Sequence, residues 1–191
     1  GRTVLAITDH SKSSVQANGL DEDRLRRHID AIHEANERID GITLLAGSEV
    51  DILSDGRLDY DDEMLARLDL VVASPHVALR QDSDAATERL CRAARHPLVT
   101  IIGHPTGRLI PERPGLDLDL DALIEAAIEG GTALEINANP FRLDLRDTHV
   151  RRAVEAGCPI SINTDAHRAE HLDFLRPRTT IPEATWTLSS R

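Results

Sequence analysis

The sequence has few cysteines and no long apolar run, and each shortage narrows the class of protein. Only two cysteines occur in 191 residues, Cys91 and Cys158, and they lie far apart. We therefore expect reduced thiols and no disulfide framework. No run of about eighteen apolar residues is present, and the N-terminus lacks the basic-then-apolar layout of a secretion signal. These absences predict a cytoplasmic protein that has no membrane partner.

Basic residues are also in short supply. Lys and Arg together number 22 against 33 Asp and Glu, which gives a formal net charge of −11 at pH 7. Affinity for a phosphate backbone comes largely from Lys and Arg, so this charge argues against a free-standing nucleic-acid binder. Bound divalent cations would offset part of the charge. The length and the apolar content of 40% fit one domain with an ordinary core.

Short apolar runs alternate with amphipathic segments, which predicts a parallel α/β fold. Six runs resemble buried strands: residues 2–7, 43–50, 70–73, 99–102, 133–136 and 159–162. Helical periodicity marks residues 21–40, 61–68, 82–96, 119–130 and 147–157, and a further helix is expected after residue 167. Two architectures satisfy this alternation, a barrel and a doubly wound sheet.

Five of the six runs end on residues that can bind a metal. Parallel strands in a barrel bring their C-terminal ends to one face, so these endings would surround one cavity. The six candidate ligands are His10, Glu49, His76, His104, Asp165 and His167. A doubly wound sheet would gather ligands mainly at one switch point. Because the candidates come from every part of the chain, the pattern favours the barrel.

The residue types indicate which metals and which chemistry to expect. Imidazole and carboxylate together suit Zn, Mn or Fe, whereas oxygen ligands alone suit Ca or Mg. Glu49 can bridge two metals with its two oxygens. Two metals about 3.5–4 Å apart can hold a phosphate oxygen, activate a water and stabilise the leaving oxygen. Hydrolysis of a phosphoester needs all three of these actions. Any single histidine could be an ordinary core or turn residue, but six candidates at strand ends together favour a metal site.

Two basic residues are candidates for binding the substrate's phosphate. Arg108 lies on a proline-rich loop, residues 105–115, which is long enough to overhang the cavity, and a guanidinium matches phosphate geometry bidentately. Lys12 lies just after His10 and is the weaker candidate. For both, the alternative is a solvated surface residue. Asp9 is a candidate to orient its neighbour His10 without binding metal itself.

The strand-end motifs resemble those of the PHP (polymerase and histidinol phosphatase) phosphoesterases, over residues 3–175. The motifs are TDH at 8–10, GSEVD at 47–51, ASPH at 73–76, GHP at 103–105 and NTDAH at 163–167. Residues 6–13, 101–109 and 134–140 are most similar to the C-terminal PHP domain of bacterial DNA polymerases X.

This resemblance implies a distorted seven-stranded (β/α) barrel with up to three metal ions, Mn²⁺ or Zn²⁺. Glu49 would bridge two of them, with Asp165 on the first metal, so that these two carboxylates are the expected catalytic pair. His76 and His104 would bind the second metal, and His10 and His167 the third.

Three functions follow from the resemblance. The first is a 3′–5′ exonuclease or 3′-end phosphodiesterase that acts on DNA 3′ ends beside a polymerase domain in DNA repair. The second is a phosphomonoesterase of histidinol-phosphatase type, whose substrate is a small phosphate ester. The third is a catalytically inactive fragment.

The sequence departs from the family at its start. The family begins with a strand that carries His-x-His and, soon after, another ligand, and no such segment precedes Thr3. We therefore expect residues 1–176 to form a PHP barrel that lacks its first strand, either as a fragment, as a domain completed by a partner, or as a degenerate protein. Residues 177–191 show no clear period and stay unassigned.

Overall fold

A computed structural model describes residues 2–175, in which strands and helices alternate. The strands are β1 Val4–His10, β2 Thr43–Asp51, β3 Leu70–Ser74, β4 Ile101–Ile102, β5 Ala133–Asn137 and β6 Ile160–Asn163. The helices are α1 Glu22–Asn36, α2 Asp62–Leu65, α3 Ser83–Ala94, α4 Leu120–Gly130 and α5 Asp147–Glu155, with 3₁₀ turns η1 Val15–Ala17 and η2 Ala169–Leu175. The tail at 177–191 lies outside the described residues. None of the helices described is long and apolar enough to cross a membrane.

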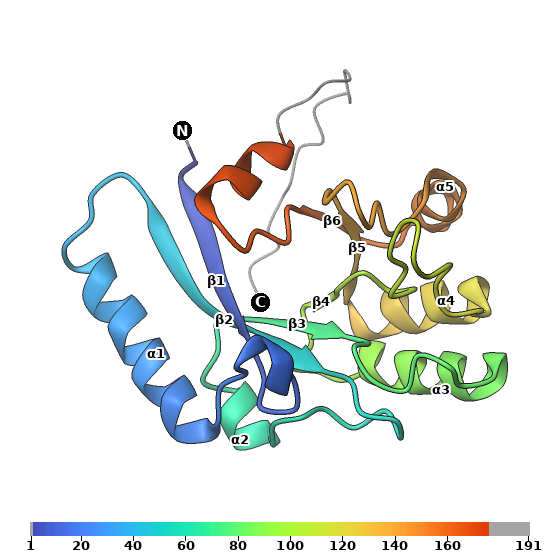
Figure 1. The fold of residues 1–191 in the computed structure, drawn as a ribbon, viewed down its shortest axis with the longest axis horizontal. Helices are drawn as coiled ribbons and strands as arrows, with labels where there is room; N and C mark the ends of the chain where they lie inside the picture. Colours follow the sequence, from blue (N-terminus) through green and yellow to red (C-terminus); the bar gives the residue numbers. More distant parts are fainter. Residues whose placement is uncertain (1, 176–191) are drawn as a thin grey trace.

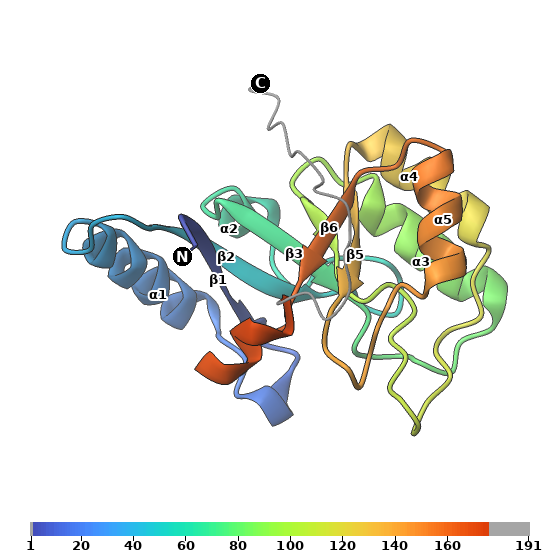
Figure 2. The same cartoon turned by 90° about the horizontal axis from the view of Figure 1, so that it is seen from above.

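The six strands form one sheet in which every neighbouring pair is parallel and the order follows the chain, β1-β2-β3-β4-β5-β6. The sheet curls into a half-barrel, with α1 beside β1 and β2 and with α3, α4 and α5 beside β4 to β6 (Figures 1 and 2). The strand order never reverses, which excludes the doubly wound alternative. The predicted α/β fold of barrel type with six strands is therefore confirmed, and β1 and β6 are its edges among the described residues.

Aspartates set the starts of four helices. Each side chain accepts a backbone N–H from the first turn and places a negative charge at the positive end of the helix dipole. These N-caps are Asp21, Asp61, Asp82 and Asp119. The helix starts expected from the sequence agree with them within one residue. The segment after residue 167 differs from the expected helix, because it forms the 3₁₀ turns of η2.

The two faces of the half-barrel have different chemistry, since successive side chains of a strand point to opposite faces. The convex face packs its apolar side chains against the helices in a single core. This set includes Ala46, Val50, Val71, Ile102 and Leu134. The alternate positions, among them Glu49, Glu135 and Asn137, face the concave side. Parallel strands are usually apolar on both faces, so these polar positions mark the concave side as the functional one.

A cavity of about 660 Å³ lies on the concave side between β1 and β6. Val72 and Ile101 contribute apolar lining, and Glu49, Asp165 and His167 lie among its polar lining residues. The η2 segment also lines the cavity and lies against the start of β1, where Arg2 Nη2 donates a hydrogen bond of 2.5 Å to the carbonyl oxygen of Leu172. The open side of the curled sheet therefore leads to the candidate ligands.

The two sheet edges predict self-association, because unpaired edge backbone can pair with another chain. We expect the 191-residue chain to associate in a concentration-dependent way, measured by size-exclusion chromatography with light scattering. Val4→Lys should reduce the associated fraction, since a charge on an edge strand hinders pairing; Val4 lies on β1 and is 53% exposed. Val154→Lys is the matched control on α5, at 57% exposure. A monomeric parent chain, or equal effects of both substitutions, would contradict this.

Candidate metal centre

Glu49 lies at the centre of three imidazoles that come from different strands or strand ends. It projects from the concave face of β2 in register with His10 of β1. His104 Nε2 lies 2.9 Å from Glu49 Oε1, and His76 Nε2 lies 3.3 Å from the same oxygen. His10 Nδ1 lies 3.5 Å from the other oxygen, Oε2. Both carboxylate oxygens are thus faced by ring nitrogens.

The spacing of these atoms fits a metal ion. The Nε2 atoms of His76 and His104 are 3.2 Å apart, so with Glu49 Oε1 they form a triangle with edges of 2.9, 3.2 and 3.3 Å. A tetrahedral zinc ion with bonds of about 2.0–2.1 Å places its ligand atoms about 3.3 Å apart. His10, Glu49 and His76 also offer ligand atoms within 4.8 Å of one another. In addition, the buried Nδ1 of His10 makes no hydrogen bond with the described residues, and a metal would satisfy it.

Hydrogen bonds set the charge of the central residues. Burial raises the pKa of Glu49, but hydrogen bonds from His104 and His76 outweigh burial and hold the pKa well below its usual range. Burial lowers the pKa of His76, but its bonds to Asp51 and Glu49 outweigh this effect and raise the pKa to about 9. For His10 burial prevails over the attraction of Glu49 and lowers the pKa. Glu49 is therefore an anion at neutral pH, the form that binds a cation.

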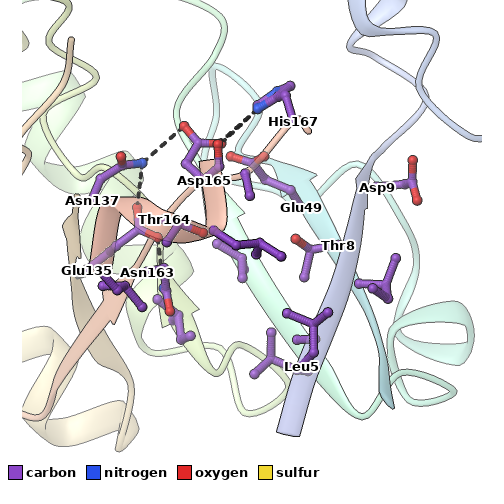
Figure 3. A pocket seen from close by; sticks show the side chains of 18 of the residues that line it. Leu5, Thr8, Asp9, Glu49, Glu135, Asn137, Asn163, Thr164, Asp165 and His167 are labelled. Atoms are coloured by element: carbon purple, nitrogen blue, oxygen red, sulfur yellow. Dashed lines mark hydrogen bonds and ion pairs between the residues drawn. The ribbon is translucent and has the colours of Figure 1, made fainter. Parts of the chain in front are cut away.

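The last two candidate ligands come from the segment that follows β6. His167 Nδ1 lies 3.5 Å from Asp165 Oδ1, and the rings of His167 and His10 have centroids 5.8 Å apart. Asp165 Oδ2 accepts a hydrogen bond of 3.1 Å from Asn137 Nδ2 and one of 3.2 Å from Arg142 Nε. Figure 3 shows Asp165 between Asn137 and His167, with Glu49 beside it. This segment therefore extends the cluster across the gap between β6 and β1.

Two candidate ligands have strained backbone. The φ angle is +26° at His104 and +50° at Asp165, a region that residues other than glycine rarely adopt. Such strain costs on the order of 1–3 kcal/mol per residue and collects at functional sites. Both residues follow the end of a strand, where the turn directs the side chain back over the concave face.

The structure brings the six candidate ligands into one contiguous cluster, and their roles as ligands stay a prediction. The two candidate phosphate-binding residues have other partners. Lys12 Nζ lies 2.5 Å from Glu22 Oε1 in an exposed ion pair. Arg108 donates hydrogen bonds to the backbone carbonyls of Arg142 and Leu143.

Asp9 does not orient His10. In Figure 3 it lies on the other side of β1 from Glu49, and its Oδ2 lies 3.1 Å from His28 Nε2. The reason is the strand alternation, which directs neighbouring side chains to opposite faces.

Asp51 is a site residue that the sequence analysis missed. Its side chain is 0% exposed, and Oδ1 lies 2.6 Å from His76 Nδ1. Because a carboxylate only accepts, His76 donates from Nδ1 and presents Nε2 to Glu49. Ser14 Oγ donates to both carboxylate oxygens, and Ser11 Oγ accepts from the Asp51 backbone N–H. The signal was present, since residues 49 and 51 of one strand share a face.

Glu135 was also missed. It is buried beneath the cluster, where Oε2 accepts the backbone N–H of His104 at 2.6 Å and Oε1 accepts Asn163 Nδ2 at 2.8 Å. Burial raises its pKa. Glu135 therefore connects β6 with the turn that follows β4. The signal in the sequence was a charged residue within an apolar strand.

No family model matches the sequence. The DNA polymerase/3′-5′ exonuclease PolX of Bacillus subtilis is 46% identical over 187 residues, which cover 98% of this chain and 33% of that protein. A probable phosphatase of Caldanaerobacter subterraneus is 33% identical over 69% of this chain and 53% of its own length. The chain thus spans about a third of the first relative and about half of the second.

Two further comparisons extend over most of the length of each relative. A probable phosphatase of Tolumonas auensis is 31% identical over 189 residues, which cover 92% of this chain and 70% of that protein. The solved structure of a Listeria monocytogenes protein assigned as a histidinol phosphatase superposes with a TM-score of 0.69 at 14% identity, over 89% of this chain and 86% of the other, and so shares the fold. With these relatives, this half-barrel and these strand-end motifs, the chain belongs to the PHP family of phosphoesterases.

Proposed function

We propose that this chain is a metal-dependent phosphoesterase module that acts on DNA 3′ ends, as a 3′–5′ exonuclease or 3′-end phosphodiesterase. The observation that carries the proposal is the triangle of Glu49 Oε1 and the Nε2 atoms of His76 and His104, with edges of 2.9–3.3 Å. The 46% identity to a polymerase/3′-5′ exonuclease supports DNA as the substrate. We also propose that the protein is cytoplasmic, which fits DNA as the substrate.

The proposed roles follow from the geometry around Glu49. Its two oxygens face different imidazoles, which suits a carboxylate that bridges two metals. Asp165 and His167 would complete the ligand set from the β6 side. Bound Mn²⁺ or Zn²⁺ would supply Lewis acidity and an activated water. Asp51 and Glu135 would keep His76 and His104 in place, by a hydrogen bond to the ring of the first and to the backbone of the second.

We also propose that residues 1–176 are one PHP module to which a further strand is added. The open edges of β1 and β6 and the cavity between them provide the position for that strand. By the family resemblance it would carry His-x-His and a following Asp. In this proposal a polymerase domain of a longer chain brings the DNA end to the module.

A small phosphate ester is the second candidate substrate. The relatives called probable phosphatases favour it, and so does the net charge of −11, because acidic surfaces repel a long phosphate backbone. A substrate with a single phosphate would avoid most of that repulsion. An inactive remnant is the third possibility.

An assay of three substrates tests the proposed function. A 3′-labelled oligonucleotide, p-nitrophenyl phosphate and histidinol phosphate are incubated with Mn²⁺ and two proteins: the 191-residue chain, and this chain extended by a strand with His-x-His. We expect the extended protein to release 3′ nucleotides faster than it hydrolyses either small ester, and EDTA to abolish the reaction. The 191-residue chain should be nearly inactive.

Each other outcome has its own meaning. Preferred hydrolysis of histidinol phosphate would establish the small-ester alternative. Turnover near zero without bound metal in both proteins would indicate a remnant. Equal rates of the two proteins would show that the added strand is not part of the working site.

Removal of one candidate ligand should lower metal content. We expect His104→Ala to lose most of its bound Mn²⁺ or Zn²⁺, because this imidazole lies 2.9 Å from Glu49. Glu49→Gln should lose at least as much, since the neutral amide removes the central charge. Elemental analysis of the folded proteins provides the measurement. His149→Ala on α5 is the control, and an equal loss there would refute the ligand assignment.

Asp51 should influence metal affinity without being a ligand. Asp51→Asn weakens the bond that fixes His76, and a change of this kind typically lowers metal affinity by about 10- to 100-fold. Calorimetric titration with Zn²⁺ measures the effect. Asp59→Asn is the matched control, because Asp59 is also a buried carboxylate but binds Ser13 and not His76. Unchanged affinity in Asp51→Asn, or the same loss in Asp59→Asn, would rule out this role.

A further inference from the structure

We propose that Arg142 binds the phosphate of the substrate at this site. The inference rests on the proposed phosphoesterase function and assigns a residue that the sequence analysis did not consider. Arg142 lies in the loop after β5, next in the chain to the exposed Phe141, and its own side chain is only 18% exposed. Its guanidinium therefore turns inward, toward the candidate ligands.

The contacts of the guanidinium with the described residues leave one buried nitrogen without a hydrogen-bond partner. Nε lies 3.2 Å from Asp165 Oδ2, which places the group beside a candidate metal ligand. Nη1 is buried and makes no hydrogen bond with any residue that the structure describes. A guanidinium has five N–H donors in a planar fork, and a buried donor without a partner is unfavourable. An anion with several acceptor oxygens, bound next to Asp165, would satisfy it.

The loop that carries Arg142 is held firmly by its neighbours. Arg108 Nε donates a hydrogen bond of 2.6 Å to the carbonyl oxygen of Arg142, and Arg108 also donates to the carbonyl of Leu143. Ile110 N–H donates to the carbonyl of Phe141 at 2.6 Å. Arg108 thus positions the backbone of the loop, and Arg142 is the arginine whose side chain reaches Asp165.

Arginines lie in the loops after β4 and β5, although the chain as a whole is acidic. Arg113 Nε donates to the carbonyl of Gly107, and burial together with the nearby charge of Arg142 lowers the pKa of Arg113. The loops after β4 and β5 therefore bring Arg108 and Arg113 close to Arg142, whose side chain contacts Asp165. One guanidinium can donate two parallel hydrogen bonds to a phosphate group. This local positive charge can therefore attract the substrate despite the net charge of −11.

The competing explanation is that Arg142 only orients Asp165. Asn137 allows the two to be separated, because its Nδ2 donates to the same oxygen, Asp165 Oδ2, at 3.1 Å. If Arg142 acts through Asp165 alone, Arg142→Ala and Asn137→Ala should have similar effects. If Arg142 binds phosphate, only its own substitution should weaken the binding of a free anion.

The test uses the extended protein of the substrate assay, loaded with Mn²⁺. It measures the binding of inorganic phosphate by calorimetry and by inhibition of hydrolysis. We expect Arg142→Ala to weaken phosphate binding by about 10- to 100-fold, the usual effect of losing a hydrogen bond to a charged group, while Mn²⁺ content is retained. KM should rise as well. Arg142→Lys should recover part of the affinity, and Asn137→Ala should leave it nearly unchanged. Arg142→Gln, which keeps a donor for Asp165, should behave like Arg142→Ala.

Other results would overturn the inference. Equal losses of phosphate affinity in Arg142→Ala and Asn137→Ala, or a loss that accompanies loss of Mn²⁺, would show that Arg142 acts only on Asp165. If Arg142→Ala fails to fold, unchanged phosphate affinity in Arg142→Gln would show that Arg142 acts only on Asp165. If the parent protein hydrolyses a phosphate ester while the Arg142 variants bind phosphate normally, the role of Arg142 is refuted and the proposed function is not. A parent protein that neither hydrolyses nor binds phosphate would refute the proposed function as well.

Discussion

The arrangement of the site depends on the burial of one negative charge. Glu49 is only 8% exposed, and a buried carboxylate is tolerated only where donors or cations compensate it. Imidazoles from the ends of β1, β3 and β4 provide that compensation, and each is held in turn by its own strand or by a further carboxylate. Asp51 and Glu135 add two more buried acids whose hydrogen bonds go to His76 and to the His104 backbone. So many acidic groups in one place favour a bound cation.

The half-barrel makes this arrangement compatible with stability. Its core lies between the convex face and the helices, so the concave face can carry polar side chains without interrupting the core. The curl of the sheet also brings the ends of β1 and β6 together, although 150 residues or more separate them in the sequence. The apolar core and the polar site residues therefore lie on opposite faces of the same strands.

In the proposed role of Arg142, the loop after β5 adds the part of the site that an anionic substrate needs. The candidate metal ligands come from strand ends, whereas Arg108, Arg113 and Arg142 come from the loops after β4 and β5. Loop residues on a rigid scaffold are well suited to substrate contacts. This division links the proposed metal-dependent reaction to selection of a phosphate ester by a chain whose overall charge is negative.

The sequence by itself determined the six strands, the aspartate-capped helices and the six candidate ligands, because these follow from local patterns of period and residue type. It also carried the resemblance to the PHP family. Only the tertiary structure decided which polar groups meet. Lys12 and Arg108 follow candidate ligands in the chain but bind Glu22 and backbone carbonyls, whereas Arg142 reaches Asp165 from another loop. Side-chain direction and loop path depend on contacts between distant segments, and a linear pattern does not encode them.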